Sequence, residues 1–186
     1  MIVILSGVSG VGKTTIAQLL EDKHNFAKAI SYTTRKKREG EENHKDYIFI
    51  EQSEFEEKIG QEFFLEYIHQ FDNFYGSSFS QIEKLLDAEK NVVMCLTHDG
   101  FLAAKKRWSD KVLGIYLLPP TIEELHARVH GRASKEHTCD KRLDAMCEIE
   151  HNELYEHKIE PSTIENTLNT VLKLIHEHNF QTHIIK

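Results

Sequence analysis

The chain has 186 residues, 40% of them hydrophobic and 28% charged, and a formal charge of −7. This length suits one domain of ordinary size, and the acidic balance argues against binding of nucleic-acid polymers through a basic face. Three cysteines form no metal-type pair, and neither a leader-like segment nor a membrane-length apolar run is visible. We therefore expect a cytoplasmic protein that binds neither membranes nor nucleic acid.

The first motif is a glycine-rich loop between an expected strand and an expected helix. Residues 7–14 read Gly-Val-Ser-Gly-Val-Gly-Lys-Thr, the full G-x-x-x-x-G-K-[ST] pattern, after an apolar run at 1–6 and before helical spacing at 15–20. Backbone N–H groups and the helix N-terminus would cradle phosphates, the lysine would reach the outer phosphates, and the threonine hydroxyl would ligate Mg²⁺. The pattern predicts a nucleoside-triphosphate site with Thr14 as the metal ligand. Its residues are Gly7, Ser9, Gly10, Val11, Gly12, Lys13, Thr14 and Thr15.

Strands and helices are expected to alternate along the rest of the chain. Short apolar runs predict strands at 26–31, 47–50, 63–68, 91–96 and 112–118. A polar loop is expected at 32–45 and a turn at 74–76. Helices are expected to start at the capping signals Ser53–Glu56, Ser78–Gln81, Thr121–Glu124 and Ser162–Glu165. The last three should reach residues 89, 131 and 178, and a further polar helix should cover 139–156. This order predicts an α/β fold with a doubly wound parallel sheet, whose ligand lies beyond the carboxyl ends of the strands.

A second group of motifs lies between the expected second strand and the helix at residue 78. Residues 31–49 read S-Y-T-T-R-x-x-R-x-G-E-x-x-x-x-D-Y-x-F, and they are followed by Phe-Leu-Glu at 64–66 and Phe-Tyr-Gly-Ser at 74–77. Arg35 and Arg38 form a fork suited to a phosphate, because guanidinium binds that group bidentately. Tyr47 and Tyr75 can each donate a phenolic hydrogen bond to the same phosphate.

These motifs resemble the nucleoside-monophosphate-binding segment of the guanylate kinase family. The resemblance continues through Leu-Leu-Pro-Pro-Thr at 117–121, Arg-x-x-Gly-Arg at 128–132 and Lys-Arg-Leu at 141–143, and covers about residues 1–145. It implies one guanylate-kinase-like domain over 1–186 with a P-loop NTPase core, an inserted nucleoside-monophosphate-binding subdomain and a helical lid. The corresponding segments are 1–31, 78–125 and 150–186 for the core, about 32–77 for the subdomain, and about 126–149 for the lid.

The resemblance implies phosphorylation of GMP, and of dGMP, by in-line transfer from ATP with Mg²⁺. Glu66 would recognise guanine, because a carboxylate only accepts hydrogen bonds and guanine presents N1–H beside its 2-amino group. Ser31 would be the second contact to the guanine edge and Ser77 would support the site. Arg35, Arg38, Tyr47 and Tyr75 would hold the phosphate. The implied catalytic residues are Lys13, Arg35 and the lid arginines Arg128, Arg132 and Arg142.

Three positions depart from the family pattern. The acidic residues expected after the strand at 91–96 are replaced by Cys95-Leu96-Thr97, a family glycine is replaced by His44, and the strand and Asn near the C-terminus are replaced by Ile159-Glu160-Pro161. Two alternatives therefore stay open: a ribose 1,5-bisphosphate phosphokinase and a non-catalytic guanylate-kinase-like binding module. The candidate residues also have ordinary structural interpretations, as surface arginines, a salt-bridged carboxylate or core tyrosines. Both a monomer and a homodimer are compatible with the sequence.

Overall fold

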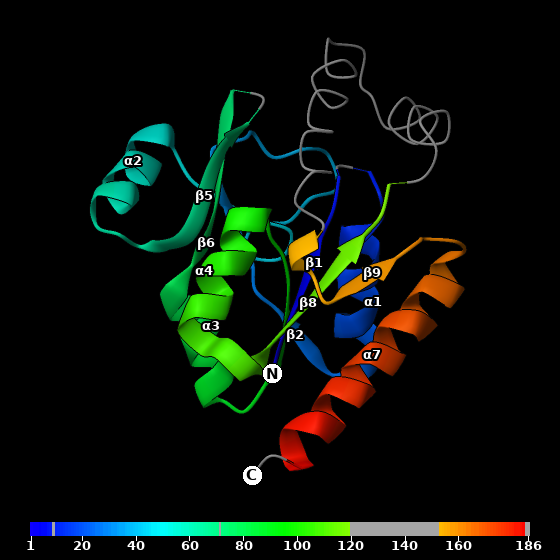
Figure 1. Cartoon of the computed structure of the whole chain (residues 1–186). Coiled ribbons are helices and arrows are strands. Elements are labelled where there is room, and N and C mark those ends of the chain that lie inside the picture. Colours follow the sequence, from blue (N-terminus) through cyan, green and yellow to red (C-terminus); the bar gives the residue numbers. More distant parts are fainter. Residues whose placement is uncertain (9, 71, 120–152, 185–186) are drawn as a thin grey trace.

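The core of the protein is a five-stranded parallel sheet. A computed structural model describes residues 1–8, 10–70, 72–119 and 153–184. The sheet has the order β2-β7-β1-β8-β9, with β1 at its centre, and its neighbouring strands run parallel (Figure 1). Its strands are β1 (Ile2–Ser6), β2 (Phe26–Lys28), β7 (Asn91–Cys95), β8 (Val112–Leu117) and β9 (His157–Ile159). The predicted parallel α/β fold is confirmed.

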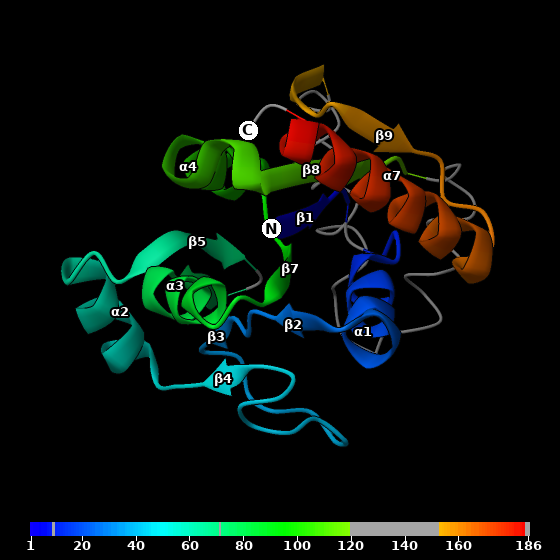
Figure 2. The same ribbon diagram turned by 90° about the horizontal axis from the view of Figure 1, so that it is seen from below.

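Helices cover both faces of this sheet (Figure 2). Val3 and Leu5 of β1 pack into the cluster beneath α1 (Lys13–His24) and α7 (Ile164–Ile184), whereas Ile2 and Ile4 pack beneath α3 (Phe79–Asp87) and α4 (His98–Trp108). Because both faces are buried, the core strands are almost uniformly apolar instead of alternating with polar residues. A short 3₁₀ helix, η1 (Ser109–Lys111), joins α4 to β8.

A second, smaller sheet is built from the chain between β2 and α3. Its order is β4-β3-β6-β5, with β3 (Tyr32–Thr33), β4 (Ile48–Phe49), β5 (Phe64–Gln70) and β6 (Asn73–Ser78). Helix α2 (Gln52–Gly60) anchors on this sheet through Phe55, which is fully buried and stacks on Phe64 at 4.5 Å and on Phe74 at 5.2 Å between ring centroids. The chain returns to the core at Ser78, whose hydroxyl accepts a hydrogen bond from the Gln81 N–H and caps α3 as predicted.

The predicted turn at 74–76 is wrong, because these residues lie inside β6. The reversal comes just before β6, where Asp72 has a φ of 57°. Aspartate tolerates this left-handed conformation, and the aromatic residues Phe74 and Tyr75 favour a strand. The glycine at 76 had suggested the turn, but a Cβ there would press on Phe64 and Phe55, so close packing is what requires it.

Several helix boundaries also differ from the prediction. Ser53 does not cap α2, which starts at Gln52 after Glu51 without a side-chain cap. Helix α7 is capped one residue later than predicted, since the Asn166 N–H donates to the Thr163 hydroxyl at 3.2 Å, and it continues to Ile184. Strand β9 was not predicted. The helix expected at 139–156 has a 3₁₀ turn at 153–154 and no helical conformation at 155–156. Its part at 139–152, like the helix expected at 121–131, lies outside the described residues.

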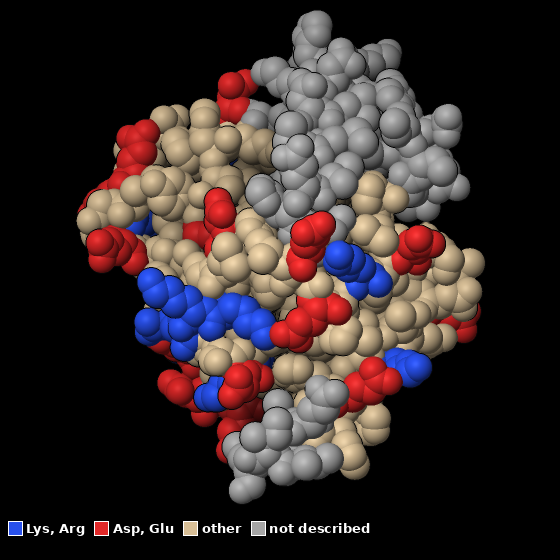
Figure 3. All heavy atoms as spheres, viewed as in Figure 1, with Lys and Arg blue, Asp and Glu red and all other residues tan. Residues whose placement is uncertain are grey.

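Charged side chains of both signs lie next to one another over α3 and α4 (Figure 3). Ion pairs join these helices to their surroundings: Arg107 of α4 binds Glu83 of α3, and Lys105 of α4 binds Glu156 at 3.2 Å. In the part of the chain that the structure describes, no helix is both long and apolar enough to cross a membrane.

Candidate functional site

The glycine-rich loop leaves the carboxyl end of the central strand β1. Gly7 has a φ of 133°, and a Cβ there would collide with the backbone carbonyl oxygen of Leu117 at the end of β8. Gly12 has a φ of 111° and is the N-cap of α1. Only glycine accepts these conformations without strain, so the loop can pass close to β8 and enter α1 directly.

The ammonium of Lys13 folds back over this loop. It donates hydrogen bonds to the carbonyl oxygens of Gly7 and, at 3.0 Å, of Val8. Val8 and Val11 are buried in the hydrophobic cluster between the core sheet and helices α1 and α7, and they anchor the loop there. The next residue, Thr14, is exposed in the first turn of α1. The predicted phosphate-binding residues are therefore assembled at a helix N-terminus, where an anion is favoured; Ser9 lies outside the described residues.

Cys95 occupies the end of β7 beside the loop. It is paired in register with Leu5 of β1, and its thiol lies close enough to Lys13 to feel the positive charge. Burial nevertheless raises the pKa of the Cys95 thiol, so this position carries no negative charge at neutral pH. Mg²⁺ prefers oxygen ligands and retains several waters while binding substrate phosphates. The exposed hydroxyl of Thr14 suits such an ion and the protonated thiol does not. Among the described residues, no group of three or more His, Cys, Asp or Glu side chains could hold a metal.

A basic and aromatic cluster lies on the second sheet. The Arg35 guanidinium lies over the Tyr47 ring, 5.3 Å from its centroid, and the Tyr47 and Tyr75 rings are 6.0 Å apart. Glu41 binds Arg35 through two hydrogen bonds of 3.0 and 2.7 Å. The structure thus brings together three of the four residues predicted to hold a phosphate.

This cluster keeps its arginine charged and its phenol neutral. Partial burial opposes the charge of Arg35, but the hydrogen bonds and charge of Glu41 outweigh it and raise the pKa of the guanidinium. The same hydrogen bonds lower the pKa of Glu41. Burial raises the pKa of Tyr47, so its hydroxyl stays a hydrogen-bond donor. Arg38 differs from the predicted fork, since its backbone N–H binds Glu41 at 2.8 Å while its side chain is exposed.

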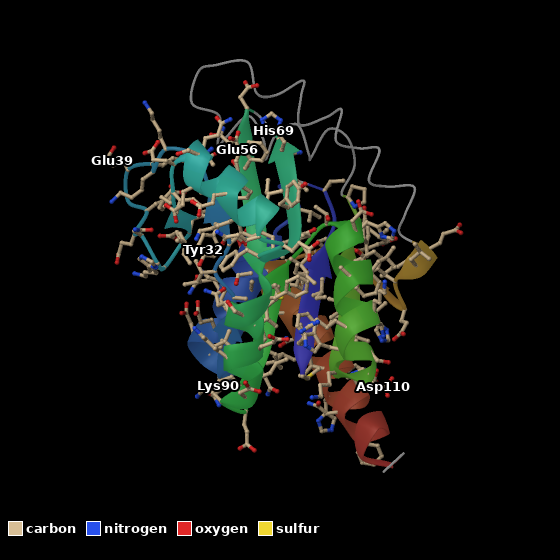
Figure 4. All side chains as sticks on the ribbon, turned by 90° about the vertical axis from the view of Figure 1, so that its left-hand side faces the viewer. Tyr32, Glu39, Glu56, His69, Lys90 and Asp110 are labelled. Atoms are coloured by element: carbon tan, nitrogen blue, oxygen red, sulfur yellow. The ribbon has the colours of Figure 1, made fainter. Side chains whose placement is uncertain are left out.

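The second sheet lies toward the carboxyl ends of the core strands. Figure 4 shows the loop with Glu39 and the hairpin with His69 at the end of the molecule opposite Lys90, which immediately precedes β7. Tyr47 and Lys13 are also both within range of an electrostatic interaction with Cys95 at the end of β7. The basic cluster and the glycine-rich loop therefore face the same edge of the core sheet, where ligands bind in folds of this kind.

The residues predicted to contact guanine are also neighbours. Glu66 follows a bulge in β5 and lies opposite Ser77 of β6 in the register of the hairpin. The hydroxyls of Ser77 and Ser31 are 3.3 Å apart. The bulge is the local reason for this arrangement, because one extra residue rotates the following side chain to the other face of the strand.

Sequence reasoning missed the partner of Glu66, which is the start of α4. The Thr97 N–H donates to one carboxylate oxygen of Glu66 at 3.3 Å, and the Thr97 hydroxyl donates to the other. Burial raises the pKa of Glu66 and the nearby Asp99 adds to this effect, while the donors on Thr97 and Gly100 act against it. Thr97-x-x-Gly100 before an apolar run was the sequence signal for this unpredicted helix, since Thr97 caps it by accepting from the Gly100 N–H.

His44 stands where the family has a glycine, and it adopts a φ of 64°. A left-handed conformation costs a residue with a side chain about 1 kcal/mol, which is a physical reason for glycine there. The three predicted lid arginines, Arg128, Arg132 and Arg142, lie outside the described residues.

Comparisons with known proteins agree on one family. The family model described as guanylate kinase matches residues 1–178. A guanylate kinase of Francisella tularensis subsp. holarctica is 34% identical over 187 residues, covering 97% of this chain and 98% of the relative. One of Chromohalobacter salexigens is 36% identical over 176 residues, covering 93% of this chain and 81% of the relative.

Solved structures show the same similarity. The crystal structure of guanylate kinase from Anaplasma phagocytophilum superimposes with a TM-score of 0.75 at 28% identity, covering 95% of this chain and 85% of that one. A gluconokinase from Sinorhizobium meliloti, with a TM-score of 0.53 at 12% identity and 97% of each chain covered, shares the fold alone. The chain belongs to the guanylate kinase family.

Proposed function

We propose that the chain phosphorylates GMP to GDP with ATP as the phosphoryl donor. The observation that carries this proposal is the pairing of two sites at one edge of the core sheet. A glycine-rich loop with Lys13 lies at this edge, and it faces a second sheet that carries both an arginine–tyrosine cluster and a half-buried carboxylate at Glu66. Such a pairing suits transfer of a phosphoryl group between two nucleotides, because both phosphates must meet in one place.

On the donor side, the backbone N–H groups of the loop and the positive end of α1 would bind the ATP phosphates. Lys13 would exchange its carbonyl partners in the loop for the outer phosphate oxygens, where positive charge stabilises the transition state. Thr14 would hold Mg²⁺, which would supply positive charge to neutralise the charge that develops on the phosphates.

On the acceptor side, the GMP phosphate would lie against Arg35, Tyr47 and Tyr75. Arg35 is already oriented by Glu41 and by the ring of Tyr47, and the rings of Tyr47 and Tyr75 lie close together beside it. The guanine edge would lie against Glu66, with Ser31 and Ser77 beside it. An adenine base presents a bare N1 acceptor there and would leave the carboxylate unpaired, which is a strong basis for rejection.

The division of the chain into core, nucleoside-monophosphate-binding subdomain and lid is part of this proposal. The separate four-stranded sheet within about 32–77 supports a distinct acceptor subdomain. Arg128, Arg132 and Arg142 are proposed to close over the phosphates as a lid at about 126–149, since closure excludes the water that would otherwise accept the phosphoryl group. A cytoplasmic location is proposed from the cysteine content alone.

The experiment that tests the proposal is an ADP-release assay with Mg·ATP and three acceptors in parallel. We expect rapid turnover with GMP, much slower turnover with AMP, and none with ribose 1,5-bisphosphate, which has no base edge for Glu66 to bind. Preferred turnover of ribose 1,5-bisphosphate would replace the proposed substrate. Tight GMP binding without ADP release would instead identify a binding module.

The acceptor site should also be sensitive to acid. Glu66 accepts from both guanine donors only as a carboxylate, and its pKa is raised, mainly by burial. Affinity for GMP is therefore present above this raised pKa and is lost as the pH falls through it. We expect kcat/KM for GMP, which reports the free enzyme, to decline at a higher pH than an ordinary carboxyl group would produce.

The matched control for this pH profile is Glu66→Gln. Ionisation of the GMP phosphate also affects the profile, but it does so equally in both proteins. The difference between the two profiles therefore isolates Glu66, and identical acid limbs would contradict its role.

A further inference from the structure

One side of the Glu66 carboxylate is bound by the start of α4. The Thr97 N–H donates to Oε1 at 3.3 Å, and the Thr97 hydroxyl donates to Oε2. The same hydroxyl oxygen accepts the Gly100 N–H at 3.3 Å. Since a hydroxyl has a single proton, this chain of bonds commits the proton of Thr97 to Glu66.

The donors that reach the carboxylate in the described part of the chain all come from the start of α4. Thr97 donates to both carboxylate oxygens, and the Gly100 N–H acts on the same carboxylate. Each carboxylate oxygen can accept about two hydrogen bonds, so the edge away from α4 can still accept, and guanine offers two donors side by side at N1 and the 2-amino group. We propose that Thr97 is a positioning residue for guanine recognition, which holds the Glu66 carboxylate so that this edge faces the base.

The start of α4 is shaped for this contact. Gly100 is buried, and the three atoms nearest to a Cβ built there all belong to Glu66, so any larger residue would displace the carboxylate. Thr97 caps a helix of the core, whereas Glu66 lies on β5 of the second sheet, against which α4 packs. The contact therefore fixes the base-reading carboxylate relative to the core sheet that carries the glycine-rich loop.

This inference rests on the proposed function and is tested with variants of one side chain. Thr97→Val keeps the shape and removes the hydroxyl, while Thr97→Ser keeps the hydroxyl. We expect Thr97→Val to raise KM for GMP by roughly 10- to 100-fold, the range for a hydrogen bond to a charged group. The values of kcat and of KM for ATP should change less than about threefold by the same reasoning. Thr97→Ser should retain the KM of the unmodified protein.

Two further variants separate positioning from a general loss of structure. Thr163→Val removes the hydroxyl that caps α7, far along the chain from Glu66, and is the matched control for a lost helix cap. It should leave KM for GMP unchanged. Gly100→Ala favours the helix but places a Cβ against the carboxylate. It should raise KM for GMP as Thr97→Val does, and it tests the proposal even where Thr97→Val does not fold.

The assays distinguish failure of the proposed function from failure of the positioning role. Failure of the unmodified protein to phosphorylate GMP would overturn the proposed function, whatever the variants do. Turnover of GMP by the unmodified protein together with an unchanged KM in Thr97→Val or Gly100→Ala would overturn the positioning role alone. Inosine monophosphate, which lacks the 2-amino group, provides a second measure: its disadvantage relative to GMP should shrink in Thr97→Val and persist in Thr97→Ser.

Discussion

Lys13→Ala is expected to lower kcat for GMP phosphorylation by about 10³-fold, a typical loss when a charge that stabilises the transition state is removed. The ammonium already lies at the mouth of the loop, where it donates to the carbonyl oxygens of Gly7 and Val8. No other lysine belongs to the glycine-rich pattern at 7–14. The measurement is steady-state ADP release at saturating GMP and Mg·ATP.

The matched control for this variant is Lys23→Ala, at the exposed end of the same helix. It removes an equal charge from α1 but lies away from the loop, so activity should be preserved. Because Lys13 also binds loop carbonyls, thermal unfolding of both variants should be compared. A Lys13→Ala protein that retains its melting temperature and more than a tenth of the activity would contradict the donor role.

Glu66→Gln is expected to lower kcat/KM for GMP by roughly 10²- to 10³-fold while raising it for AMP. The amide keeps one acceptor but presents an NH₂ group to the donors of guanine, and the same NH₂ group can donate to the bare N1 of adenine. The ratio of kcat/KM for GMP to kcat/KM for AMP should therefore fall sharply, because the value for GMP decreases while the value for AMP increases. Competition between the two nucleotides in one assay measures this ratio directly.

Glu62→Gln is the control for this change. Glu62 is exposed in the turn just before β5, so the substitution removes the same charge next to the same strand without reaching the predicted base site. It should leave the ratio unchanged. An unchanged ratio in Glu66→Gln would instead remove this residue from guanine recognition and reopen the identity of the acceptor.

The core of the fold was predictable because its signals are local. The buried strands β1, β7 and β8 are short apolar runs, and the loop between β1 and α1 contains a complete motif. Prediction was wrong where tertiary packing decides the outcome. Gly76 looks like a turn residue in the sequence, yet the structure places it in a strand, where two phenylalanine rings require its small size.

The candidate site was predicted as a set of residues but not as a set of contacts. Arg35 and Arg38 look equivalent in the motif, yet Glu41 fixes the side chain of the first and binds only the backbone of the second. The contact between Glu66 and Thr97 joins strand β5 to the start of helix α4, 31 positions apart in the chain, and no local pattern encodes such a contact. The structure also shows what occupies the positions where the family has acidic residues. Cys95 lies near Lys13, whereas Thr97 donates hydrogen bonds to Glu66.

The clamp of Glu41 on Arg35 has a consequence for the thermodynamics of substrate capture. A free arginine loses about 1.5–2 kcal/mol of rotamer entropy when it is immobilised. Two hydrogen bonds to Glu41 and a face-on contact with Tyr47 already restrict this side chain. The entropic cost of ordering the guanidinium therefore falls on folding and not on binding, and an incoming phosphate meets a receptor that is already rigid.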